Sequence, residues 1–287
     1  MKERKKVLLW LLIVAVLLVA SILTGNHAGQ SETIQQTMRD AVLHNENRID
    51  LLGWKAVNPG LISGFVVTAI LLIAAAVLRI CWIPRFKYVP GRCQLVLEEV
   101  VGLFDRMAKT SAPRMNRFLG AYIFGAGTYI FVGTLFELFG FQAITTAGRA
   151  ITLPAPLSDV NGAIALGCLS YVVILSGGIA GNGIKGVKAT LKEFSLPISM
   201  SFRLFGALLS GLLVTELVYY YINLSYILPV VVGVLFTLLH AVIQSYVLTM
   251  LTAMFYGEVS QPEPETEKEP KHARARHRSH ENTPQAA

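Results

Sequence analysis

Charged side chains are scarce in this sequence. Asp, Glu, Lys and Arg make up 15% of its 287 residues, whereas soluble domains contain about 25%. The mean hydropathy is +0.54, and apolar runs long enough to cross a bilayer recur along the chain. The composition therefore excludes an ordinary soluble domain and predicts a polytopic membrane protein whose surroundings are the lipid bilayer.

Other absences narrow the function. Cys81, Cys93 and Cys168 show no metal-ligand spacing, and their odd number gives no disulfide framework. We interpret them as apolar filler side chains. The sequence contains no GxxxxGK[ST] phosphate loop and no internal repeat of the kind many transporters have. Because Lys and Arg gather at the ends of apolar runs, the net charge of +7 indicates cytoplasmic loops rather than nucleic-acid binding. We expect no metal ion and no cofactor.

The apolar runs predict an all-α fold with five core transmembrane helices plus an N-terminal helix. The N-terminal run, Val7 to Leu23, follows a basic cluster and is longer than the apolar part of most signal peptides. We favour a retained anchor over a cleaved signal segment. The expected organisation is an anchor or signal segment over 1–25, an external segment over 26–57, a membrane domain over 58–256 and a disordered cytoplasmic tail over 257–287.

Charge also predicts the orientation of the core spans. The basic segments that follow the first and third of them should lie in the cytoplasm. Apolar residues at helical spacing from Leu95 to Phe104 predict an amphipathic interfacial helix in the first basic segment. The last two spans should form a long hairpin with a turn near Asn223 to Ser225. The expected core spans are about 58–83, 119–141, 160–181, 197–221 and 226–256.

One arginine, Arg203, stands inside the fourth core span. An arginine at the centre of a membrane helix costs roughly 2.5 to 3.5 kcal/mol even on lenient scales, so such residues usually face a cavity or a partner. Its face of the helix carries only small side chains, which allow close approach of another helix. The alternative is an arginine that extends to the lipid headgroups. The small residues are Ser199, Gly206, Ala207 and Ser210.

Further polar residues lie in or near the spans. His240 and Gln244 are one turn apart on the last helix and can relay a proton, although a single buried histidine is usually a core residue. Glu216 lies on the arginine helix. Three polar residues lie near the outer ends of spans: Glu137 in the second core span, and Asp159 with Asn161 at the start of the third. Exposure to water explains their polarity as well as a role in ion transport does.

Several motifs resemble a known family. The stretch PISMSFRLFGALLSG, followed by LLHAVIQSYVLTMLTAMF, is similar to the two C-terminal helices of subunit a in bacterial F-type ATP synthases. Two earlier stretches, PGRCQLVLEEVVGLF and LPAPLSDVNGAIAL, resemble the family's PGxxQxxxE segment and its Pro-x-x-Asp-x-Asn start of a span. Together the motifs cover about residues 90–256.

The resemblance implies a function. The chain would be the stator-side ion channel of ATP synthase in the bacterial inner membrane, not itself catalytic, passing H⁺ or Na⁺ between two half-channels. Its partners would be the c-ring, against which the last hairpin lies, and the b subunits of the peripheral stalk. Arg203 would face the rotor carboxylates with Gln244 as its partner on the last helix. Asp159 and Asn161 would line the outer mouth, and Glu193 matches a carboxylate that often precedes the proline.

Some positions depart from the family pattern. Ala207 replaces a frequent Asn, and Leu212 replaces a frequent Glu, for which Glu216 one turn later is the expected substitute. Counting from the predicted turn, Glu216 and His240 are offset by roughly 12 Å along the helix axis, so we expect separate stations bridged by water. A self-contained ion channel or transporter and a structural scaffold remain alternatives.

Overall fold

The protein is described by a computed structural model that covers residues 49–51, 54–114, 116–144, 150–220 and 228–261, together with Leu12 and Val16. The expected N-terminal anchor or signal helix, most of the external segment, the turn of the last hairpin and the tail from residue 262 lie outside the described residues. The elements discussed below belong to the described part of the chain.

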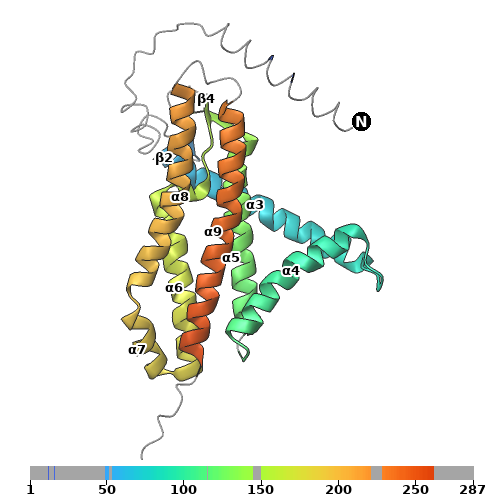
Figure 1. The fold of residues 1–287 in the computed structure, drawn as a ribbon, viewed down its shortest axis with the longest axis vertical. Coiled ribbons are helices and arrows are strands. Elements are labelled where there is room, and N and C mark those ends of the chain that lie inside the picture. The colour runs from blue at the N-terminus through green and yellow to red at the C-terminus, as the bar shows by residue number, and fades with distance from the viewer. Residues whose placement is uncertain are drawn as a thin grey trace, which may run out of the picture.

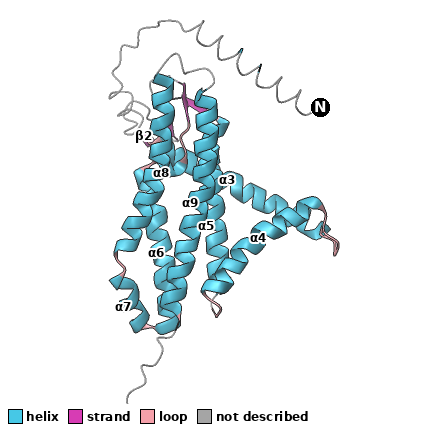
Figure 2. Ribbon diagram, in the orientation of Figure 1, coloured by secondary structure: helices cyan, strands magenta, loops and turns pink. Residues whose placement is uncertain are grey.

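Two short antiparallel hairpins accompany the helices (Figure 2). The first, β1 with β2, directly precedes α3, and the second, β3 with β4, connects the end of α5 to α6. In chain order the elements are β1 Ile49–Leu51, β2 Trp54–Val57, α3 Pro59–Val77, η1 Leu78–Trp82, η2 Ile83–Arg85, α4 Arg92–Ser111, α5 Asn116–Phe136, η3 Glu137–Phe139, β3 Gln142–Ile144, β4 Ala150–Thr152, η4 Pro156–Ser158, α6 Val160–Asn182, α7 Ile184–Lys192, α8 Ser195–Tyr220 and α9 Leu228–Ser260.

Five helical segments are long and apolar enough to span a membrane, which confirms the predicted all-α, multi-pass fold. The interfacial helix predicted after the first of them is α4. The five segments are Pro59–Arg85, Asn116–Phe139, Val160–Asn182, Ser195–Val214 and Val230–Ser260.

Helix α7 was not predicted: the sequence analysis assigned this segment only as a basic cytoplasmic stretch after the third core span. Gly183, at φ 58°, ends α6 and reverses the chain. The backbone of Gly186 then packs directly on that of Gly178 in α6, an approach that only glycine permits. The hydroxyl of Tyr171 also donates to the carbonyl of Thr190 (3.1 Å). Tertiary contact, rather than an intrinsic preference, therefore makes this segment helical.

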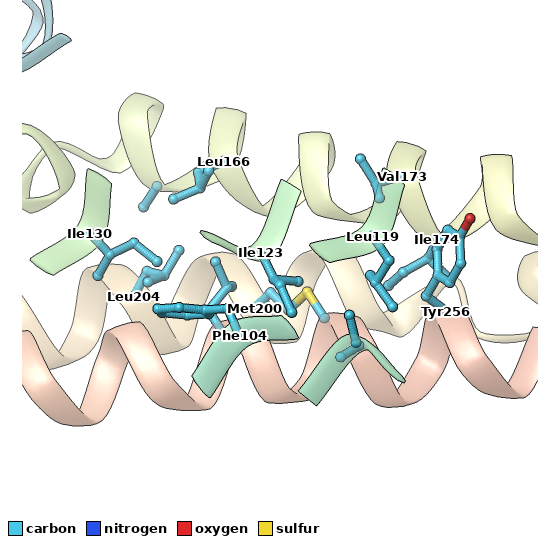
Figure 3. Close-up of a cluster of buried hydrophobic side chains, with 14 of the residues drawn as sticks. Phe104, Leu119, Ile123, Ile130, Leu166, Val173, Ile174, Met200, Leu204 and Tyr256 are labelled. Atoms are coloured by element: carbon cyan, nitrogen blue, oxygen red, sulfur yellow. The ribbon is translucent and has the colours of Figure 1, made fainter. Parts of the chain in front are cut away.

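Helices α5, α6, α8 and α9 lie side by side as a bundle (Figure 1). Their facing sides share one apolar core, into which α4 contributes Phe104 (Figure 3). Close packing depends on Gly127 of α5, whose carbonyl accepts a hydrogen bond from the Ser245 hydroxyl of α9 (2.8 Å). A β-carbon on Gly127 would lie 2.8 Å from the Phe104 ring.

Helices α3 and α4 form an arm that projects from the side of the bundle (Figure 1). The buried residues of α3 all lie in its first half, from Pro59 to Val67, whereas those of α4, Phe104 and Ala108, lie in its second half. The tip of the arm, around residues 82–95, therefore stands clear of the bundle.

The bundle helices and α3 run in different directions, so they cannot all be parallel to the membrane normal. A straight crossing of a hydrocarbon core about 30 Å thick takes about 20 residues. Helix α9 has 33 residues, which corresponds to about 50 Å. Helix α9 is therefore longer than a straight crossing of the hydrocarbon core requires, whereas α5 and α6, with 21 and 23 residues, match it.

Helix α9 also continues past Tyr256, where the sequence predicted the disordered tail to begin, and ends at Ser260. Its last turn is held by packing: Gly181 of α6 contacts the backbone of Ser260. The side-chain amide of Asn182 donates to the carbonyls of Val259 (2.9 Å) and Gln261 (2.6 Å). These bonds satisfy carbonyls that a helix C-terminus leaves unpaired.

Candidate functional site

Helix α8 has two opposite faces. Met200, Leu204 and Leu208, four residues apart, are buried in the core shared with α6 and α9, and Leu196, one turn before Met200, is buried as well. The predicted small-residue face is turned away from that core: Ser199, Arg203, Gly206 and Ser210 are exposed, and Ala207 at its edge is half-buried. The bundle thus leaves this surface of α8 uncovered.

Arg203 is exposed about 12 Å along the axis from the start of α8. Within the described part of the chain, its guanidinium takes part in no ion pair and no hydrogen bond. The nearest acidic residue in the sequence, Glu193, lies at the C-terminal cap of α7, two residues before α8 begins. The described residues therefore supply no anion for an arginine inside an apolar span.

A shallow hollow of about 330 Å³ follows Arg203 along the same helix. It is lined by Gly206 and Ser210 together with the larger residues Leu209, Leu213, Val214 and Leu217. A β-carbon on Gly206 would meet no atom within 4 Å. The small residues thus make a concave surface that larger side chains would fill.

The contact between Gly211 and His240 sets the register of α8 against α9. A β-carbon on Gly211 would lie 3.1 Å from Nδ1 of His240, so the half-buried imidazole occupies the space that the glycine leaves. Because the helices are antiparallel, one turn further along α9 corresponds to one turn back along α8. Gln244 is therefore level with Ala207, about one turn from Arg203.

Gln244 is buried, with 7% of its surface exposed. Its Oε1 atom has no hydrogen-bond partner, the one such buried side-chain atom in the described part of the chain. A buried acceptor without a partner costs about 1–3 kcal/mol. No hydrogen bond joins Gln244 to Arg203 within the described residues, so the two predicted partners lie on adjacent helices without direct contact.

The register also corrects the predicted spacing of Glu216 and His240. Glu216 belongs to α8, and its side chain lies outside what the structure describes. Its backbone is five residues, or about 7.5 Å along the axis, from Gly211. Because Gly211 is level with His240, Glu216 is offset from His240 by the same distance. The sequence estimate of roughly 12 Å was too large, because it centred the turn near Asn223 to Ser225. The observed contact between Gly211 and His240 places the centre of the hairpin further along the chain.

Asp159 and Asn161 lie where α6 begins, against the start of α3. Oδ1 of Asp159 accepts hydrogen bonds from the backbone N–H (3.3 Å) and the side-chain amide (3.4 Å) of Asn161, as an N-cap does. The side chain of Asn58 caps α3 in the same way, accepting from the N–H of Gly60 (2.9 Å). A β-carbon on Gly60 would lie 2.9 Å from Cβ of Asp159. The sequence analysis started the first core span at residue 58 but did not identify Asn58 as its cap, although Asn before Pro-Gly is a recognisable helix start.

Glu137 is in η3, directly after α5 and at the opposite end of that helix from α4. It is half-buried, and its carbonyl accepts the N–H of Gly140 (3.2 Å), which ends the helix at φ 61°. The structure therefore does not gather all the predicted polar residues at one point. Arg203, Gln244, His240 and Glu216 belong to the α8–α9 pair, while Asp159, Asn161 and Glu137 lie at element ends.

A cavity of about 490 Å³ opens where α6, α7, α8 and α9 meet. Its charged lining residues are Lys185, Lys192, Glu193 and Glu258. Leu196 is its α8 residue, two turns or about 10 Å before Arg203. The sequence analysis missed Glu258 because it assigned that residue to the tail. In the described part of the chain, no three His, Cys, Asp or Glu side chains gather as metal ligands would.

Comparison with known proteins establishes the family. A model of the ATP synthase A chain family matches residues 62–257, a range that runs from α3 nearly to the end of α9. The chain belongs to this family. Two similar curated proteins, both named ATP synthase subunit a and from two strains of Cereibacter sphaeroides, are 27% identical over 199 residues. Each match covers 65% of this chain and 76% of the relative.

Membership of the ATP synthase A chain family confirms the resemblance predicted from the motifs. Together with the five apolar helices, it makes the chain a multi-pass membrane protein that is a component of the membrane sector of ATP synthase. The matched range includes Arg203, Glu216, His240 and Gln244 of the α8–α9 pair.

Proposed function

We propose that this chain is the stator-side ion channel of ATP synthase. In this proposal it passes H⁺ or Na⁺ between two half-channels and the carboxylates of the c-ring, which drives rotation and ATP synthesis without chemistry on ATP by the chain itself. The observation that carries the proposal is Arg203: an exposed guanidinium without an anion in the described residues, on a face of small side chains that the bundle leaves uncovered.

Electrostatics gives Arg203 its role. Opposite unit charges 4 Å apart attract by roughly 4 kcal/mol at an effective dielectric of 20, so a rotor carboxylate reaching the guanidinium is favoured in its ionised form and releases its ion. The fixed positive charge also repels a cation that would pass directly between the half-channels. A membrane potential supplies about 2.3 kcal/mol per charge per 100 mV to drive the ion through.

The small-residue face is the proposed rotor contact. Ser199, Gly206, Ala207 and Ser210 let a rotor helix approach α8 closely, because small side chains permit short distances between helices. The hollow of about 330 Å³ beyond Arg203 lies on the same surface. The b subunits of the peripheral stalk are the other proposed protein partners, and the bacterial inner membrane is the proposed location.

The cytoplasmic half-channel is proposed to open at the cavity beside Glu193. The cavity contains the carboxylates of Glu193 and Glu258 and ends about two turns short of Arg203 on α8. Basic residues on α7, among them Lys185 and Lys192, indicate that this end faces the cytoplasm. Carboxylates at the mouth of such a cavity can take up and release protons.

The outer half-channel is proposed to follow the α8–α9 pair, through Glu216, His240 and Gln244. The partnerless oxygen of Gln244 supports this path, because a buried acceptor is satisfied once water or a passing proton donor reaches it. Asp159, Asn161 and Glu137 are proposed at the outer mouth. Both hydrogen bonds of Asp159 go to Oδ1, so Oδ2 is available to water.

The test is proton-driven ATP synthesis in inverted membrane vesicles that contain the whole complex with Arg203→Ala. Synthesis should be lost while the amount of assembled complex stays unchanged, as measured by its ATP hydrolysis after detergent release. Retained synthesis would refute the mechanism. Ion conduction by the purified chain alone in vesicles, without a c-ring, would favour the alternative of a self-contained ion channel or transporter.

A further inference from the structure

The tip of the α3–α4 arm carries an open cavity of about 460 Å³. Its lining includes Trp82 in η1, Arg85 at the end of η2, Lys87 in the connecting loop and Arg92 at the start of α4. Three cations thus line one cavity, and no Asp or Glu is among its lining residues. The ion path proposed above uses none of these residues.

Gln94 holds the loop in place around the cavity. Its side-chain oxygen accepts the backbone N–H of Lys87 (3.1 Å), and its amide nitrogen donates to the carbonyl of Lys87 (3.0 Å) and to Oε1 of Glu98 (2.7 Å). Gln94 and Glu98 are the Gln and the Glu of the PGxxQxxxE pattern. The motif therefore fixes the backbone of Lys87 against the first turn of α4, which gives the cavity a defined wall.

The cations of the cavity carry charge that this part of the chain does not neutralise. Elsewhere on α4, Arg106 pairs with Glu99 and Lys109 with Asp105, both at 2.6 Å. Arg85, Lys87 and Arg92 form no ion pair within the described residues. The cavity is therefore a concentrated positive site at the end of an arm whose other charges are largely balanced.

The position of the cavity indicates a membrane ligand. It lies where the span Pro59–Arg85 ends, and Trp82 is three residues from that end, whereas tryptophan is enriched at membrane–water interfaces. On α4, beyond the lining residue Gln94, the apolar side chains of Val96 and Val100 are exposed. Val96 is about 40° around the helix from Arg92, so cations and apolar side chains share one side of the arm.

We propose that this cavity binds the phosphate of an anionic phospholipid of the inner leaflet, with Arg85, Lys87 and Arg92 around the headgroup. The acyl chains then lie along the exposed apolar strip of Val96, Val100 and Leu103. The charge complementarity of three unpaired cations to a phosphodiester supports a lipid, and the adjacent apolar strip distinguishes a lipid from a free phosphate ion. The bound lipid fixes the tip of the arm at the cytoplasmic surface.

The test uses the fluorescence of Trp82 in the full chain, with Trp10 and Trp54 replaced by Phe. The protein is reconstituted into phosphatidylcholine vesicles that contain a small fraction of brominated phosphatidylglycerol or of brominated phosphatidylcholine. We expect stronger quenching by the anionic lipid. Arg85→Gln with Lys87→Gln should weaken that preference about 25-fold, since each surface cation contributes about fivefold in affinity for anionic lipid.

Matched variants separate the cavity from general surface charge. Arg106→Gln with Glu99→Gln removes an ion pair of α4 outside the cavity without changing the net charge and should leave the preference unchanged, while Arg85→Lys with Arg92→Lys should retain most of it. Equal quenching by both lipids, or an equal loss in the Arg106→Gln, Glu99→Gln variant, would overturn the proposal and favour a protein partner at the cavity. Displacement of the brominated lipid by millimolar inorganic phosphate would also overturn it, in favour of a free anion.

Discussion

Gly211 of α8 packs directly against His240 of α9, where a β-carbon on the glycine would lie 3.1 Å from Nδ1 of the imidazole. The two residues are far apart in sequence, and their contact determines which turns of the last two helices meet. It places Gln244 about one turn from Arg203. Changes at this contact should therefore affect the alignment of the proposed ion path as well as stability.

A bulky side chain at Gly211 should destabilise the helix pair. Gly211→Leu forces carbon atoms into the space of His240, and overpacking of this kind typically costs 1–3 kcal/mol. Thermal unfolding of the purified chain in detergent should show a lowered midpoint. The control is Gly206→Leu on the uncovered face, where a β-carbon meets nothing within 4 Å.

Gly206→Leu should leave the unfolding midpoint unchanged yet block ATP synthesis in the complex, because the added side chain holds the rotor helix away. An equal fall in stability for both variants would show that the face of Gly206 is packed within the chain.

Arg203→Lys should also lose most ATP synthesis. Lysine keeps the positive charge, but its compact ammonium lacks the planar fork of the guanidinium and can lose its proton in an apolar setting. The measurement is ATP synthesis in vesicles energised by a pH gradient, normalised to assembled complex. Synthesis at the wild-type rate would mean that any positive charge suffices.

Gln244→Leu should separate stability from function. A buried oxygen without a hydrogen-bond partner destabilises the folded state by about 1–3 kcal/mol. The substitution removes this oxygen, so the purified chain should unfold at the same or a higher temperature. Passive proton conduction through vesicles stripped of the catalytic sector should fall. Lowered stability together with normal conduction would instead give Gln244 a purely structural role.

Crosslinking tests which face of α8 meets the rotor. Cys81, Cys93 and Cys168 are exposed, so they are first replaced by serine. Single cysteines at Ser199, Ala207 and Ser210 should then form disulfides with a cysteine-substituted c-ring helix, and one at Leu212 should do so far less. Equal yields at Leu212 and Ser210 would show that α8 presents a different face.

Glu216→Gln should slow proton uptake and shift its pH dependence, because the variant lacks the carboxylate that exchanges protons with water. His240→Ala should have the same effect more weakly. The measurement is the initial rate of proton conduction across a series of pH values. Rates unchanged by both substitutions would make Glu216 a residue at the level of the lipid headgroups and His240 a packing residue.

The sequence alone predicts the spans and the face of α8 that carries Arg203. Both follow from local rules: an apolar run of sufficient length forms a membrane helix, and residues three or four apart share a side of it. The motifs likewise predict the family, because they are contiguous stretches of sequence. The amphipathic character of α4 is predictable for the same reason.

Contacts between distant segments decide the rest. Helix α7 forms because Gly186 meets Gly178, and α9 extends to Ser260 because α6 holds its last turn. The cavity that joins Glu193 to Glu258 and the missing partner of Gln244 exist only once the helices pack. Helical periodicity specifies which side of a helix is apolar, but the register between two helices depends on which side chains fit which gaps. The tertiary structure therefore decides how far Arg203, Gln244, His240 and Glu216 lie from one another.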